Sequence, residues 1–201
     1  MIFTSLSTPI RSRFGRALAL TGAVSVLAAS TACDDPFAPR ASAAVRTDSF
    51  TVFSVTETPV NAPAAFNIVF FTTLRLEPTY GFDLVFDIDE SGNAVIIPAR
   101  LVGGAVTFNR VVGLQKITGD YDALTRAPAT GYQYESPVTL AVGEGALVEL
   151  HADQCQFQTS RIVYAKLQIQ ALDPVLRRIA FRITYDPNCG FRSFLPGVPT
   201  N

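Results

Sequence analysis

The chain of 201 residues contains no tryptophan, a single histidine (His151) and only two lysines, Lys116 and Lys166. One histidine excludes a zinc site built from several histidines of one chain, and no Cys-x-x-Cys pair is present. The stretch Asp87–Asn93 resembles the start of an EF-hand loop, but Pro98 occupies the position of the bidentate glutamate. No basic cluster marks a nucleic-acid footprint. The sequence therefore predicts no metal, no cofactor and no nucleic-acid partner.

Catalytic chemistry has few candidates. His151 would serve a Ser-His-Asp triad, but the sequence has no Gly-x-Ser-x-Gly elbow to present the nucleophile. Asp83 with Asp87, or Glu144 with Glu149, are the carboxylate pairs that would run glycoside hydrolysis. On alternating strands and turns, these acids are more simply interpreted as solvated surface groups. We therefore predict no catalytic residue and keep a carboxylate-based hydrolase as the alternative.

The N-terminus has the pattern of a secretory signal. Three arginines precede the apolar run 17–29. No acidic residue occurs before Asp34. This run has 13 residues, fewer than the roughly 20 that a membrane-spanning helix needs. We predict a cleaved signal helix over residues 1–32; the alternatives are a retained membrane anchor and a buried core helix.

Small residues, Ser30-Thr31-Ala32, lie directly before Cys33. This pattern resembles the lipobox of bacterial lipoproteins, in which the cysteine is diacylated and becomes the new N-terminus. Ala32 and Cys33 match the lipobox, whereas Ser30 stands where the family prefers leucine. The resemblance covers residues 11–33 alone and implies lipidation of Cys33 and anchoring to a membrane of the bacterial cell envelope. A cut by a general signal peptidase, which would give a soluble periplasmic or secreted protein, is the alternative.

Cysteine parity supports this interpretation. The chain has three cysteines, and an odd count in an exported protein leaves one thiol to be explained. If Cys33 is acylated, Cys155 and Cys189 remain as a pair in an oxidising compartment. A hairpin between them brings its two open ends close together, which is the geometry that a bridge requires. We predict a disulfide between Cys155 and Cys189; the alternative is two separate thiols.

The mature chain shows the alternation typical of β-strands. We expect a flexible tether over residues 33–47 and one domain over residues 48–201. The clearest unit is a hairpin over 161–186. In its first strand, every second residue from Val163 to Ala171 faces the core, and every second residue from Tyr164 to Gln170 faces water. The run 66–74 is expected to be one long central strand. Short strands and frequent turn signals predict an all-β antiparallel β-sandwich, with a closed β-barrel as the alternative.

The segment 116–136 is the longest one without clear periodicity, and a loop of this length in a compact domain is usually functional or disordered. It gathers Tyr121, Arg126, Tyr132 and Tyr134, residue types that suit recognition when they lie on a rigid scaffold. The alternative is that the tyrosines fold back over an open sheet edge. We expect a membrane-anchored, non-catalytic module that binds an unknown protein or small ligand; a hydrolase and a structural accessory subunit are the alternatives.

Overall fold

The computed structural model describes residues 38–77, 81–102 and 111–200. It divides into two compact units, Met1–Pro39 and Arg40–Asn201, and the strands of the described residues all belong to the second. The predicted signal peptide, residues 1–32, and the predicted lipidation site Cys33 lie outside the described residues.

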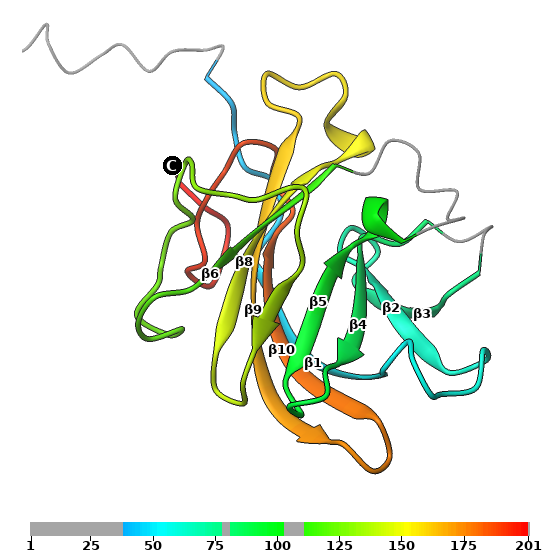
Figure 1. Ribbon diagram of the computed structural model, residues 1–201. Helices are drawn as coiled ribbons and strands as arrows, with labels where there is room; N and C mark the ends of the chain where they lie inside the picture. The colour runs from blue at the N-terminus through cyan, green and yellow to red at the C-terminus, as the bar shows by residue number, and fades with distance from the viewer. Residues whose placement is uncertain (1–37, 78–80, 103–110, 201) are drawn as a thin grey trace, which may run out of the picture. The chain divides into compact units, whose positions relative to one another are not determined.

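The second unit is a β-sandwich, as predicted (Figure 1). Two antiparallel five-stranded sheets face each other, and we name them after a central strand of each. The β10 sheet has the order β1 (Arg46–Phe53), β10 (Arg178–Asp186), β9 (Ile162–Asp173), β8 (Gly145–His151) and β6 (Val112–Lys116). The β4 sheet has the order β3 (Thr72–Arg75), β2 (Pro63–Asn67), β4 (Leu84–Ile88), β5 (Ala94–Pro98) and β7 (Val138–Leu140). Two short 3-10 helices, η2 (Ala99–Leu101) and η3 (Asp153–Cys155), complete the elements of the described residues.

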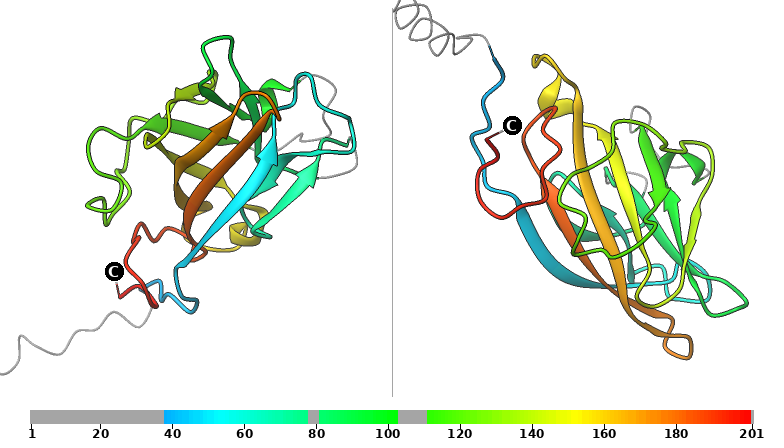
Figure 2. Two further views of the ribbon diagram at one scale, coloured as in Figure 1. Left: turned by 90° about the horizontal axis from the view of Figure 1, so that it is seen from below. Right: turned by 90° about the vertical axis from the view of Figure 1, so that its left-hand side faces the viewer.

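Phenylalanine rings hold the two sheets together. Figure 2 shows the sheets from two further directions. Phe181 of the β10 sheet is fully buried, with its ring centroid 5.4 Å from that of Phe66 and 4.7 Å from that of Phe86, both on the β4 sheet. Phe50 of β1 adds an edge-on contact to Phe66 at 4.9 Å. Each such pair contributes about 0.5–1.5 kcal/mol beyond the burial of its area. The inward-facing residues of both sheets therefore pack into one shared aromatic core.

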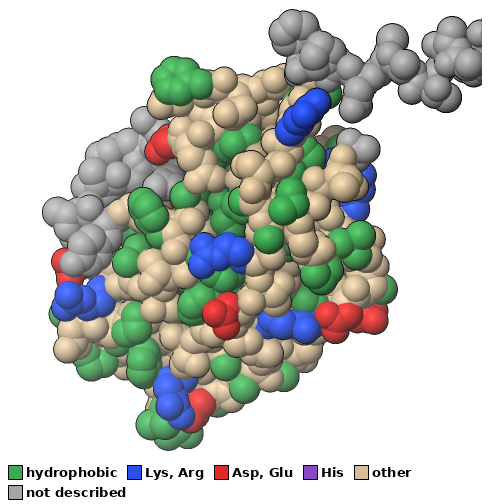
Figure 3. Space-filling model, turned by 180° about the vertical axis from the view of Figure 1, so that it is seen from behind, with side chains coloured by type: hydrophobic (Ala, Val, Ile, Leu, Met, Phe, Trp, Pro, Cys, Tyr) green, Lys and Arg blue, Asp and Glu red, His purple; other side chains and the backbone are tan. Residues whose placement is uncertain are grey.

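The surface carries charges of both signs. On the face drawn in Figure 3, basic and acidic side chains are interspersed. Several of the described charges form exposed ion pairs, such as Arg100 with Glu135 at 2.7 Å and Lys116 with Glu144 at 2.6 Å. Exposed pairs of this kind contribute no more than about 1 kcal/mol each. The fold therefore depends on its core and on its buried polar groups.

The run 66–74 is not the single central strand expected from its apolar side chains. It forms β2, a turn and β3, because two buried polar side chains fix the turn. Asn67 accepts a hydrogen bond from the Phe70 N–H at 2.7 Å, and Asp83 accepts one from the Ile68 N–H at 2.7 Å. Phe71 then takes a left-handed backbone conformation with φ of 57°. Hydrophobicity alone does not reveal this reversal.

The hairpin predicted over 161–186 is present as β9 and β10. Its register shifts once, since Ala180 pairs with Ala171 while Phe181 pairs with Ile169. The extra residue of this bulge turns Ala171 to the exposed face, so its predicted place in the core row was wrong. The remaining core row, from Val163 to Ile169, is buried as predicted.

The N-terminal segment joins the domain earlier than expected. β1 begins at Arg46, and the Asn188 carboxamide accepts hydrogen bonds from the N–H groups of Ser42 and Ala43 at 2.8 and 3.0 Å. The same side chain donates to the Ala43 carbonyl at 2.8 Å. Part of the predicted tether, from Ser42 onward, is therefore bound to the sandwich.

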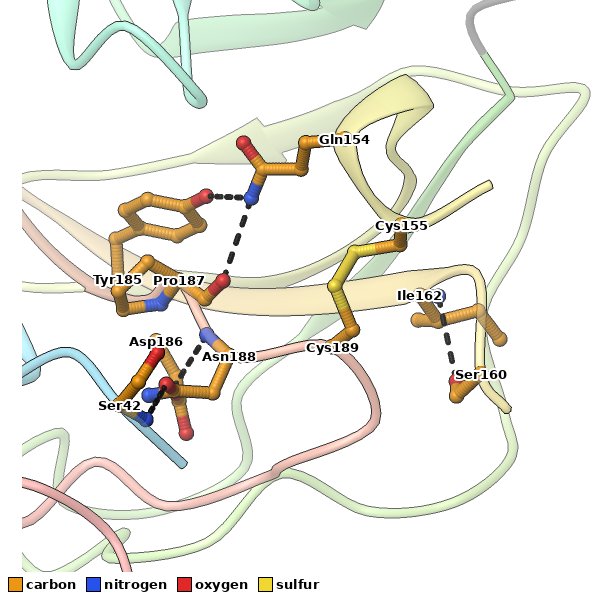
Figure 4. The surroundings of a disulfide bond; sticks show 10 residues. All are labelled: Ser42, Gln154, Cys155, Ser160, Ile162, Tyr185, Asp186, Pro187, Asn188 and Cys189. Carbon is orange, nitrogen blue, oxygen red and sulfur yellow. Dashed lines mark hydrogen bonds between the residues drawn. A yellow bond between two sulfur atoms is a disulfide. The ribbon is translucent and has the colours of Figure 1, made fainter. Parts of the chain in front are cut away.

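The predicted disulfide between Cys155 and Cys189 is present (Figure 4). It links η3, just before β9, to the chain just after β10, and thereby closes the open end of the hairpin. Cys155 is fully buried. Close by, the Gln154 carboxamide donates to the Tyr185 hydroxyl at 3.1 Å. The bridge therefore lies at the same end of the sandwich as the bound N-terminal segment.

Replacing both bridged cysteines, Cys155→Ala with Cys189→Ala, should lower the free energy of unfolding by up to about 4 kcal/mol, because the closed loop no longer restricts the unfolded chain. Urea denaturation of the double variant against the oxidised wild type measures the loss. Reduction of the wild type should reproduce it. Equal urea midpoints for the oxidised, reduced and substituted proteins would contradict a stabilising bridge.

Candidate functional site

The segment 117–136 lies on the outer face of the β10 sheet together with residues 190–196. We call these two segments the cap. They pair with each other through a bridge between Arg126 and Ser193, and with the sheet through a bridge between Gln133 and Leu114 (Figure 1). Under the cap lies a second hydrophobic cluster of Ala127, Tyr132, Leu147, Tyr164 and Phe194.

The predicted recognition residues occupy different positions in the cap. Tyr121 and Tyr132 are buried, with 3% and 7% exposure, and Tyr134 is half-buried. Arg126 alone of the four presents an exposed side chain. The tyrosines thus cover the sheet, as in the alternative, and the bridge between Gln133 and Leu114 pairs the same segment with the edge strand β6. A partner that docks on the cap would meet Arg126 and the exposed backbone, with the tyrosine rings beneath.

Lys166 was predicted to face water, and that prediction was wrong because the cap covers it. The side chain is 4% exposed, and its ammonium donates to the carbonyls of Tyr121 at 2.6 Å and Leu124 at 2.8 Å. It also lies 4.2 Å from the centroid of the Tyr121 ring and 5.4 Å from that of Phe194. Burial lowers the pKa of Lys166. This lysine therefore fixes the loop from below.

Glu149 is the second charged residue under the cap, with 5% exposure. The Tyr134 hydroxyl donates a short hydrogen bond to its carboxylate. Burial, and then this hydrogen bond to Glu149, raise the pKa of Tyr134 to about 12. Burial and the charge of Glu149 likewise raise the pKa of Tyr164 to about 12. Both phenols therefore remain protonated near neutral pH and act as neutral groups beside the carboxylate.

A second polar cluster, which we call the clamp, joins the two sheets at the end opposite the disulfide. It consists of Ser54, Thr56, Asp87 and Arg177. The Arg177 guanidinium donates to Thr56 at 2.6 Å and to Ser54 at 2.9 Å, and lies 3.3 Å from Asp87. Arg177 adopts this position with a left-handed φ of 54°, a conformation that costs a non-glycine residue free energy.

The contacts within the clamp alter the pKa of Asp87. Burial opposes ionisation of Asp87, but hydrogen bonds from Ser54, Thr56 and the Ile88 N–H together lower its pKa. Ser54 is fully buried and donates to Asp87. Its hydroxyl is therefore not presented to a substrate, and the clamp acts as a connection between sheets.

The carboxylates that were considered for hydrolysis are not brought together in pairs. Asp83 and Asp87 are four residues apart along an extended segment, hence about 13 Å, beyond the roughly 5–9.5 Å of glycosidase pairs. Asp83 binds the turn of the β4 sheet and Asp87 belongs to the clamp. Glu144 binds Lys116 and Glu149 binds Tyr134.

The remaining candidates are also accounted for. His151 is exposed at the end of β8, and Asp89 accepts hydrogen bonds from the N–H groups of Ser91 and Asn93, which makes the acidic stretch a hairpin turn. Among residues 38–77, 81–102 and 111–200, no three potential metal ligands gather in one place. In the same ranges, no helix has the length and hydrophobicity to cross a membrane.

The described surface includes two hollows that differ in size and lining. One, of about 90 Å³, is lined mainly by apolar side chains between Val55 and Leu76. The other, of about 370 Å³, lies over Thr51 and Ala180, beside the ion pair of Arg178 and Asp173. Neither contains convergent carboxylates. Comparison with protein-family models, with curated proteins and with solved structures finds no match, so the functional argument rests on the sequence and the geometry.

Substitution in the cap should cost stability. Tyr132→Ala truncates a buried ring and should lower the free energy of unfolding by about 3–5 kcal/mol. Tyr134→Phe removes a donor from buried Glu149 and should cost about 1–3 kcal/mol. Urea denaturation measures both, with exposed Arg126→Ala as the control, which should change the value by less than about 0.5 kcal/mol. If Tyr132→Ala proves as neutral as the control, the tyrosine does not hold the cap.

The clamp predicts a pH dependence. Because the pKa of Asp87 is lower in the folded protein, its contribution to stability is present above the unfolded pKa and is lost as pH falls through the folded pKa. Asp87→Asn should therefore reduce stability at pH 7 and flatten the loss between about pH 5 and pH 2. Urea midpoints over this range test it, with exposed Asp48→Asn as the matched control. Parallel pH profiles for Asp87→Asn and wild type would contradict the assignment.

Proposed function

We propose that the protein is a bacterial envelope lipoprotein, exported by residues 1–32 and anchored by a lipid on Cys33, whose β-sandwich is a non-catalytic binding module. The observation that carries the proposal is the disulfide between Cys155 and Cys189. Structural disulfides persist in oxidising compartments such as the periplasm and cell surface, and are rare in the cytosol. The bridge therefore supports export.

The same bridge supports lipidation by elimination. It consumes two of the three cysteines of the chain, and the remaining one lies next to Ser30-Thr31-Ala32, the small residues of the lipobox pattern. An acyl-bearing cysteine removes the odd thiol that would otherwise remain in an oxidising compartment. Two or three acyl chains on one residue give firm anchoring, since a single chain binds membranes only marginally.

The binding role is supported by the internal contacts of the buried and half-buried charged groups. Lys166 and Glu149 form hydrogen bonds within the cap. Asp87 and Arg177 form theirs within the clamp. The cap is a long irregular loop on a rigid sheet, the arrangement that recognition sites favour. Its exposed surface around Arg126 is the candidate contact for a partner protein or a small ligand.

Metabolic labelling with a fatty acid tests the anchor. The wild type expressed in a bacterial host should incorporate the label and fractionate with membranes, whereas Cys33→Ser should lose the label. Cys155→Ala with Cys189→Ala is the matched control, because it removes the other two cysteines and should keep the label. Label that persists in Cys33→Ser would exclude this cysteine as the lipid carrier.

A further inference from the structure

One end of the sandwich holds the N-terminal segment, and we call it the tether end. It is defined by Asn188, which binds Ser42 (Figure 4) and also Ala43. Two phenylalanines project from its loops into solvent: Phe157, after η3, is 90% exposed, and Phe70, in the turn between β2 and β3, is 73% exposed.

Contacts with the Tyr185 side chain place both loops at this end. The Phe71 ring stacks on Tyr185 with centroids 6.0 Å apart, which puts the Phe70 turn beside the last residues of β10. The Tyr185 hydroxyl accepts a hydrogen bond from Gln154, which precedes Phe157 by three residues in the same loop. The two exposed rings therefore flank the point where the N-terminal segment meets the domain.

These rings have the chemistry of membrane-interface side chains. Each is a large apolar group on a loop tip, and leaving it in water forgoes the free energy of burial. They are separate projections rather than one flat apolar patch of the kind that a protein partner covers. Aromatic side chains on projecting loops suit insertion between lipid headgroups.

Charge distinguishes this end from the opposite one. Arg40, Arg46 and Arg161 are exposed at the tether end, beside the exposed acid Asp153. At the opposite end, around the clamp and the turns next to it, the exposed or half-exposed acids Glu57, Asp89, Glu90 and Asp173 outnumber the bases Arg177 and Arg178. Anionic lipid headgroups therefore favour the tether end, although Val60, Val175 and Leu176 are exposed in the loops of the clamp end.

The length of the segment between Cys33 and Ser42 also favours the tether end as the end that faces the bilayer. Ser42 lies nine positions after Cys33, and a segment of this length reaches at most about 30 Å. The tether end lies within that reach of the bilayer for any conformation of the segment. The clamp end lies roughly 35 Å farther along the 12-residue β9, a distance that exceeds the reach of even a fully extended segment.

We propose that the tether end docks on the phospholipid bilayer, with Phe70 and Phe157 inserted among the headgroups and Arg40, Arg46 and Arg161 facing anionic phosphates. The proposal rests on the proposed lipid anchor, which brings this end to the membrane. Docking fixes the orientation of the domain and turns the clamp end away from the bilayer.

The absence of tryptophan makes the test direct, since one introduced tryptophan is the sole indole of the chain. Phe157→Trp and Phe70→Trp place it at the tether end, and Val175→Trp places it at the clamp end. The chain from Cys33 onward, which contains the whole sandwich, is coupled through its one thiol outside the disulfide to maleimide lipids in phosphatidylcholine–phosphatidylglycerol vesicles. Emission is then recorded with and without bromine-labelled lipids.

Bromine-labelled lipids should quench Phe157→Trp and Phe70→Trp about twofold, with a blue shift on coupling, and leave Val175→Trp unchanged. Quenching of Val175→Trp alone, or of none of the three, would overturn the proposal. Thermal unfolding of each variant checks that the sandwich is intact. Because the anchor is attached chemically, the result is independent of whether cells acylate Cys33, and a failure of the lipoprotein proposal is detected separately by labelling.

Discussion

The Cys155–Cys189 disulfide is the constraint to which the rest of the structure is connected. It closes the β9–β10 hairpin, and these two strands form the centre of the β10 sheet because β10 pairs with β1 and β9 pairs with β8. Next to the bridge, Asn188 binds the N-terminal segment and Gln154 binds Tyr185. Structural disulfides persist mainly in oxidising compartments, so the bond that orders one end of the sandwich also supports the proposed export.

Burial on both faces of one sheet is the second organising feature. An antiparallel sheet ordinarily buries one face and exposes the other. Here the cap converts the outer face of β8 and β9 into a second core, which encloses Lys166 and Glu149. A buried charge is costly unless it is hydrogen-bonded, and carbonyls and a phenol supply those bonds.

Local patterns predicted local structure well. The alternation of 161–186 predicted the β9–β10 hairpin, and cysteine parity predicted the bridge at its open end. Patterns failed where a distant segment or a single polar group decided the outcome. Lys166 lies in the row of β9 that was predicted to face water but is covered by a loop some 40 residues earlier in sequence. Asn67 reverses a run that reads as continuously apolar, and a bulge moves Ala171 outward. Such effects arise from tertiary contacts that periodicity does not encode.

The central claim is that one bridge and one acylated cysteine account for all three cysteines of an exported chain. Intact mass spectrometry of the protein extracted from membranes without reductant, after alkylation, tests this in a single spectrum. The account predicts a chain that begins at Cys33, carries a diacylglyceryl group, lacks the two hydrogens of the bridge and takes up no alkylating agent. A mature chain with an alkylated Cys33, or with alkylated Cys155 and Cys189, would contradict it.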